Sequence, residues 1–135
     1  MAKKFPITVY HNPKCGTSRG VLEILEAAGH KPEVIEYLKA GWTKKQLKEL
    51  FAAAGLTARQ AMRTNVPEAE ALLDEKVSDA KIIDAMVEHP ILVNRPIVVT
   101  PKGAALCRPS EQVFALLDRV PAEFVKEDGE VVRNP

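Results

Sequence analysis

The chain has 135 residues, of which 46% are hydrophobic and 27% charged, and this composition fits one globular domain with an ordinary core. Its 19 basic residues are balanced by 18 acidic ones, and the formal net charge of +1 gives no electrostatic reason to expect a nucleic-acid partner. No apolar run is long enough for a secretory signal or a membrane span, so we expect no membrane partner and a cytoplasmic location.

The first third of the chain predicts a β-α-β unit. Apolar residues over 5–10 are typical of a buried strand, and the spacing of Val21, Ile24, Leu25 and Ala28 is that of one face of a helix. A second strand is expected over residues 34–38.

The middle of the chain predicts helices. Thr43 and Thr57 are each followed three residues later by glutamine, a capping-box pattern that marks the start of a helix, and Gly55 ends the first of these helices. Further helices are expected over residues 67–75 and 78–88, so that the helical insertion spans about residues 43–89.

The last part of the chain returns to strands. Residues 97–100 and 104–107 predict a hairpin around a turn at 101–103, and a helix is expected from Pro109 and Ser110. The tail, about residues 123–135 with a turn at Asp128-Gly129, is expected to be loosely held. The predicted fold class is α/β, a single domain over residues 1–135 with a mixed four-stranded sheet and flanking helices.

One cysteine lies where the first strand should lead into the first helix. At a helix N-terminus, unpaired backbone N–H groups and the helix dipole favour the thiolate form of Cys15 and also favour a bound oxyanion. Guanidinium groups suit arsenate, phosphate or sulfate because their planar forks spread the anion's charge. Arg63, Arg95 and Arg108 are the candidate arginines for this role. No metal-type spacing of cysteines is present, and we expect no metal site.

The order of elements, with cysteine at the first strand-to-helix junction and proline opening the third strand, resembles the thioredoxin superfamily. A group of short motifs is similar, more specifically, to the glutaredoxin-coupled arsenate reductases, and this resemblance covers nearly the whole chain. These motifs are His11-Asn12-Pro13, Cys15-Gly16-Thr17-Ser18-Arg19, Arg63-x-Asn65, His89-Pro90-Ile91-Leu92, 94–101 and 106–111.

The resemblance implies an arsenate reductase that releases arsenite. In that reading Cys15 attacks arsenic, the three arginines hold arsenate, glutathione serves as co-substrate with no bound cofactor, and glutaredoxin resolves the mixed disulfide. It also gives His11 a supporting role in keeping Cys15 ionised. The alternative for His11 is that it ends the first strand and hydrogen-bonds the loop.

The remaining motif residues are assigned to structure. We expect Asn12, Gly16, Thr17, Ser18 and Arg19 to shape the loop, with Ser18 also a candidate helix cap or sulfur partner. Cys107 is predicted to be a buried core residue in preference to a resolving thiol. Arg59 and Arg119 lie outside the motifs and are interpreted as surface residues.

Two other functions remain open at this stage. One is a thioredoxin-like redox regulator or adaptor that uses its cysteine as a sensor, although such a protein needs no cluster of arginines. The other is a monothiol glutaredoxin-like reductase of a different substrate, for which the run from Cys15 to Ser18 is an acceptable C-x-x-S motif.

Overall fold

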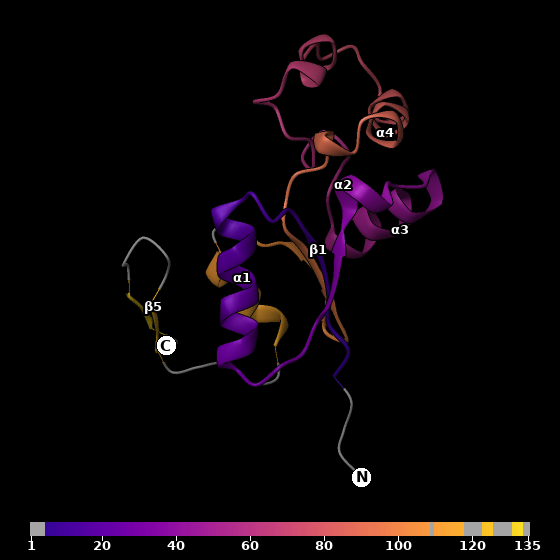
Figure 1. Cartoon of the computed structure of the whole chain (residues 1–135). Coiled ribbons are helices and arrows are strands. Elements are labelled where there is room, and N and C mark those ends of the chain that lie inside the picture. The colour runs from indigo at the N-terminus through magenta and orange to yellow at the C-terminus, as the bar shows by residue number, and fades with distance from the viewer. Residues whose placement is uncertain (1–4, 109, 118–122, 126–130, 134–135) are drawn as a thin grey trace. The chain divides into compact units, whose positions relative to one another are not determined.

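The computed structural model describes residues 5–108, 110–117, 123–125 and 131–133 (Figure 1). The chain divides into two compact units. The first unit comprises Met1–Glu36 and Arg95–Pro135, and the second comprises Tyr37–Asn94. In the described residues, no helix is long and apolar enough to cross a membrane.

The first unit is built on a four-stranded sheet in the order β2-β1-β3-β4. Strand β1 is parallel to β2 and antiparallel to β3, and β3 forms an antiparallel hairpin with β4. The predicted fold class, a thioredoxin-like mixed sheet with flanking helices, is therefore confirmed. The strands are β1 (Thr8–His11), β2 (Glu33–Glu36), β3 (Ile97–Thr100) and β4 (Gly103–Leu106).

Helix α1 (Gly16–Ala27) joins the two parallel strands and covers one face of the sheet with the 3-10 helix η3 (Ser110–Leu116) (Figure 1). The predicted apolar face of α1 is confirmed, since its Val21, Ile24 and Leu25 are fully buried. Burying side chains of this size contributes roughly 1.5–3 kcal/mol each. The core of this unit consists of Ile7, Val9, Val21, Ile24, Leu25, Val98, Cys107, Val113, Leu116 and Leu117.

The second unit is helical. It contains α2 (Tyr37–Ala40), α3 (Lys44–Ala54), the 3-10 helix η1 (Pro67–Leu72), α4 (Asp79–Glu88) and the 3-10 helix η2 (Pro90–Leu92). The capping box predicted at Thr43 is confirmed, because its side chain accepts from the Gln46 N–H and the Gln46 side chain accepts from the Thr43 N–H. Gly55 ends α3 with φ of 67°, a left-handed conformation that glycine adopts without steric cost.

Some predicted boundaries are wrong. Strand β2 ends at Glu36, and Tyr37 instead begins α2, where its buried hydroxyl donates to the Val93 carbonyl at 3.3 Å. The two reciprocal hydrogen bonds expected between Thr57 and Gln60 are present, but they close turns and no helix follows.

Other differences concern the ends of elements and the tail. The helix predicted over 67–75 is the shorter η1, and the second strand of the hairpin starts one residue early. On α4, Ile82, Ile83 and Met86 are buried, whereas Val87 is 38% exposed. Strands β5 (Glu123–Val125) and β6 (Val131–Arg133) form an antiparallel pair that the sequence did not predict. Pro109 and the turn expected at Asp128-Gly129 lie outside the described residues.

Candidate functional site

The predicted position of Cys15 at the start of a helix is confirmed. Cys15 is the N-cap residue of α1, with extended backbone angles of φ −97° and ψ 122°, and it is 7% exposed. Its N–H donates to the Asn12 carbonyl at 3.0 Å, and the Asn12 side-chain oxygen accepts from the Lys14 N–H at 3.0 Å. These bonds fold the loop back on itself and present the sulfur at the positive end of α1.

The topology of the sheet explains why two arginines reach this loop. The first residue of β3, Ile97, pairs with Tyr10 near the end of β1 and with Leu106 at the end of β4. Arg95 just before β3 and Arg108 just after β4 are therefore at the end of the sheet where β1 leads into the cysteine loop.

Arg108 contacts the nucleophile directly. Its Nη1 donates to Cys15 Sγ at 3.4 Å and to the Arg95 carbonyl at 3.1 Å. The carbonyl bond fixes the guanidinium group beside the sulfur, while the rest of the planar fork has further N–H donors. The peptide bond between Arg95 and Pro96 is cis.

The surroundings of Cys15 favour its thiolate. Burial acts to raise the pKa of Cys15, but the backbone N–H of Ser18, the hydrogen bond from Arg108 and the charges of Arg95 and Arg108 outweigh it and lower the pKa. The Cys15 sulfur accepts no N-cap hydrogen bond from the described first turn of α1. The Ser18 N–H therefore acts on the sulfur as a nearby dipole.

His11 and Ser18 form a buried pair behind the sulfur. His11 Nδ1 lies 2.7 Å from Ser18 Oγ, and this oxygen also accepts from the Asn12 N–H at 3.1 Å. Burial lowers the pKa of His11, and the charge of Arg19 adds to this effect while that of Glu36 opposes it. His11 is therefore neutral at neutral pH, and its contact joins the end of β1 to the first turn of α1.

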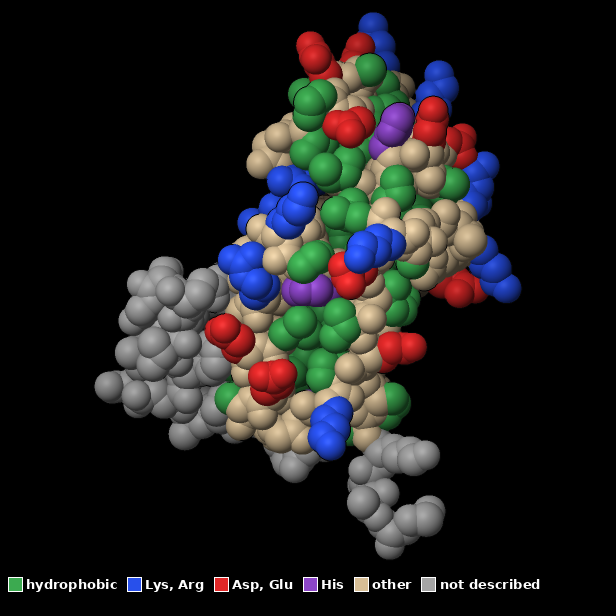
Figure 2. Space-filling model, viewed as in Figure 1, with side chains coloured by type: hydrophobic (Ala, Val, Ile, Leu, Met, Phe, Trp, Pro, Cys, Tyr) green, Lys and Arg blue, Asp and Glu red, His purple; other side chains and the backbone are tan. Residues whose placement is uncertain are grey.

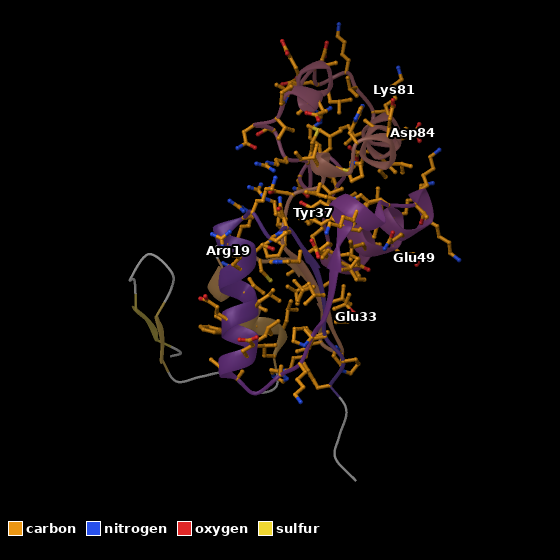
Figure 3. All side chains as sticks on the ribbon, in the orientation of Figure 1. Arg19, Glu33, Tyr37, Glu49, Lys81 and Asp84 are labelled. Atoms are coloured by element: carbon orange, nitrogen blue, oxygen red, sulfur yellow. The ribbon has the colours of Figure 1, made fainter. Side chains whose placement is uncertain are left out.

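An exposed arginine also holds the loop that precedes Cys15. Arg19, labelled in Figure 3, lies on the first turns of α1 and donates from Nη1 to the Pro13 carbonyl at 2.8 Å. Figure 2 shows blue Lys and Arg side chains beside this end of α1. The positive potential there is of the sign that an oxyanion requires.

Arg63 belongs to the second unit. Its N–H donates to the Leu92 carbonyl at 2.7 Å, and its Nε donates to the Asn65 side-chain oxygen at 2.9 Å. Cys15 belongs to the first unit, and the part of Arg63 in the anion site stays a prediction. The contact with Asn65 was not predicted, although the Arg63-x-Asn65 motif contained the signal for it.

The interpretation of Arg59 as a surface residue is wrong. Its guanidinium group donates to the carbonyls of Leu72, Asp74 and Val77 at 3.1, 3.1 and 2.7 Å. Arg59 thus fastens the segment between η1 and α4. Arg119 lies outside the described residues.

The prediction that Cys107 packs in the core is confirmed. Cys107 is fully buried, its S–H donates to the Ala105 carbonyl at 3.7 Å, and both cysteines are free. Burial raises the pKa of Cys107 to about 12, so this thiol is protonated at neutral pH. The environments of the two cysteines therefore act in opposite directions: that of Cys15 lowers its pKa, and that of Cys107 raises its pKa.

The surroundings of Cys15 contain neither a metal-binding cluster nor the pocket described below, within the described residues. Over the described residues, no group of three or more His, Cys, Asp or Glu side chains is placed to hold a metal ion. A pocket of about 470 Å³ lies at the other end of α1, lined by residues that include Leu22, Glu26, His30 and Val34. Leu22, the lining residue nearest to Cys15 in the sequence, is already about 10 Å from it along the helix axis.

Comparisons with known proteins agree with this geometry. Two arsenate reductases of Synechocystis sp., ArsI1 and ArsI2, are each 65% identical to the chain over 129 residues, covering 93% of it and at least 90% of the relatives. The arsenate reductase of Escherichia coli strain K12 is 49% identical over the same length, with 92% of that protein covered.

A solved structure of an arsenate reductase also resembles this chain. An arsenate reductase from Vibrio cholerae matches with a TM-score of 0.80 and 40% identity, covering 85% of this chain and all of that one. The family described as the ArsC family matches residues 10–116, which include Cys15, Arg63, Arg95 and Arg108. The chain therefore belongs to the ArsC family.

Proposed function

We propose that this protein is an arsenate reductase in which the Cys15 thiolate attacks arsenic. The observation that carries the proposal is the 3.4 Å contact between Arg108 and the Cys15 sulfur at the N-terminus of α1. This contact places Cys15, a nucleophile with a lowered pKa, beside the guanidinium group of Arg108, which can bind an oxyanion. The names of the relatives supply the substrate, because the geometry alone suits arsenate, phosphate and sulfate equally.

The first step forms a bond between sulfur and arsenic. The Cys15 thiolate attacks arsenate, one arsenic–oxygen bond breaks, and the oxygen leaves as water after taking up protons. Arsenic remains in the pentavalent state. Arg95 and Arg108 hold the remaining oxygens, whose charge grows during attack, so these arginines act most strongly in the transition state. The Arg63-x-Asn65 motif makes Arg63 the expected third arginine.

The second step transfers the electrons. The sulfur of glutathione attacks the Cys15 sulfur, the sulfur–arsenic bond breaks, and its electron pair stays on arsenic, which leaves as trivalent arsenite. Cys15 is then a mixed disulfide with glutathione. Glutaredoxin attacks the glutathione sulfur of this disulfide and releases Cys15 as thiolate.

The need for external thiols follows from the cysteine content. The chain has two cysteines, and the second is Cys107. Cys107 is fully buried with a pKa of about 12, and the thiolate is the form that attacks a disulfide. Resolution by Cys107 would require both exposure and deprotonation, whereas glutathione is available in the cytoplasm.

Selectivity against phosphate then depends on reactivity. Phosphate has nearly the same shape and charge as arsenate and should compete for the same arginines. Attack by sulfur followed by reduction is open only to arsenic. Inorganic phosphate is therefore expected to inhibit competitively without being turned over.

The monothiol glutaredoxin-like function is the second candidate, because Cys15 and Ser18 form a C-x-x-S motif. The Ser18 hydroxyl is, however, already hydrogen-bonded to His11 and Asn12. An arginine that favours the thiolate would also serve disulfide exchange, so the names of the relatives are what favour arsenate as the substrate.

The test compares two substrates under the same conditions. Arsenate and a glutathione mixed disulfide are each offered to the protein with glutathione, with and without glutaredoxin, while consumption of reducing equivalents is followed. We expect turnover of arsenate that falls sharply when glutaredoxin is omitted. Turnover of the disulfide alone, above the rate with glutaredoxin but without this protein, would replace the proposal with the glutaredoxin-like function, and turnover of neither would favour the regulator.

A further inference from the structure

The Ser18 side chain is placed to connect His11 to the nucleophile. Ser18 is fully buried in the first turn of α1, and its Oγ lies 2.7 Å from His11 Nδ1 and 3.1 Å from the Asn12 nitrogen. A hydroxyl has one proton to donate and accepts through its lone pairs. The Asn12 N–H uses the acceptor side, which leaves the Ser18 proton for His11.

The protonation state of His11 fits this assignment. A neutral imidazole with its proton on Nε2 has an acceptor at Nδ1, so it receives the Ser18 proton while the Ser18 oxygen accepts from the Asn12 N–H. A protonated imidazole has donors at both nitrogens and would face the hydroxyl with a second donor. Burial and Arg19 lower the pKa of His11 against the opposing charge of Glu36, and this holds the neutral form.

Ser18 is the third residue of the helix that Cys15 caps, a position whose backbone N–H is directed toward the N-cap side chain. The Ser18 N–H is the largest influence that lowers the pKa of Cys15, ahead of the contributions of Arg108 and Arg95. Its hydroxyl fastens this part of the helix to the end of β1, and its N–H direction depends on that attachment. A small rotation of the first turn would move the dipole away from the sulfur.

We propose that Ser18 is a positioning residue through which neutral His11 acts on Cys15, by holding the first turn of α1 so that its backbone N–H faces the sulfur. His11 then contributes geometry and no positive charge. Within the described part of the first unit, the charges of Arg95 and Arg108 lower the pKa of Cys15. The proposal concerns the cysteine of the proposed function, but its test uses no arsenate and so can fail independently.

The experiment measures the rate at which iodoacetamide alkylates Cys15 as a function of pH, without oxyanion. The variants are His11→Ala, Ser18→Ala, the double variant and His11→Asn. Buried, protonated Cys107 reacts slowly, and a Cys107→Ser background removes it entirely. Below the pKa, the rate falls about tenfold for each unit by which the pKa rises.

Both single alanine variants should shift the alkylation profile to higher pH, and the double variant should shift it no further than Ser18→Ala alone. His11→Asn should retain the wild-type profile, because the asparagine side-chain oxygen occupies nearly the position of Nδ1 and accepts the same proton without any charge. Circular dichroism and thermal unfolding, with exposed Lys48→Ala as the control, show whether each variant is folded.

Two results would overturn the proposal. If His11→Ala shifted the profile by the same amount with and without the Ser18 hydroxyl, His11 would act directly on the sulfur. If folded His11→Asn behaved like His11→Ala, a charge or a property of the imidazole ring would be required in place of an acceptor.

Discussion

Replacement of Arg108 by alanine tests the contact on which the candidate site depends. The change removes a charged donor 3.4 Å from the Cys15 sulfur, together with its anchoring bond to the Arg95 carbonyl. Hydrogen bonds to charged groups contribute roughly 1.5–3 kcal/mol, or a factor of about 10 to about 150 in rate. Because Arg108 is exposed, we expect the lower end of this range, and a smaller effect at high salt.

The assay is kcat/KM for arsenate with saturating glutathione and glutaredoxin, accompanied by the alkylation profile of Cys15 without arsenate. Arg108→Ala should lower kcat/KM by about tenfold or more and raise the pKa of Cys15. Arg108→Lys should recover part of both effects, since it keeps the charge but loses the planar fork. If Arg108→Ala matched Lys48→Ala in both measurements, the contact would have no role in binding or in ionising the sulfur.

Three further changes test neighbouring parts of the account. Cys107→Ser should retain most arsenate turnover but unfold more easily, because it places a more polar atom in the core. Asn65→Ala should lower kcat/KM for arsenate, because Arg63 loses the partner of its Nε, and inhibition by phosphate should weaken in parallel. Arg59→Ala should lower the unfolding free energy by roughly 1–3 kcal/mol, measured by urea unfolding, while leaving kcat/KM of the folded protein unchanged.

Local signals in the sequence predicted local structure well. The capping box at Thr43 and the left-handed glycine at Gly55 depend on residues within one turn, and both are present. The placement of Cys15 at the start of α1 follows in the same way from a strand pattern, a loop and a helical pattern in direct succession. The mixed four-stranded sheet followed from the succession of elements, because short connections restrict the possible topologies.

Contacts between distant segments were harder to predict. Tyr37 leaves the strand pattern because its hydroxyl reaches Val93, and Arg59 is fixed by carbonyls that follow it by more than ten residues. The pairing of His11 with Ser18 likewise spans a strand end and a helix, so the sequence did not distinguish tuning of the sulfur from support of the loop. The pair β5–β6 has short strands with little apolar periodicity.

Arsenate reduction by Cys15→Ser is the most direct test of the central claim. Oxygen in place of sulfur changes the volume little but removes the soft nucleophile. With glutathione and glutaredoxin present, the account predicts that the wild-type protein produces arsenite and that the folded Cys15→Ser variant produces none above the background without protein. Arsenite formation by that variant at the wild-type rate would contradict the account.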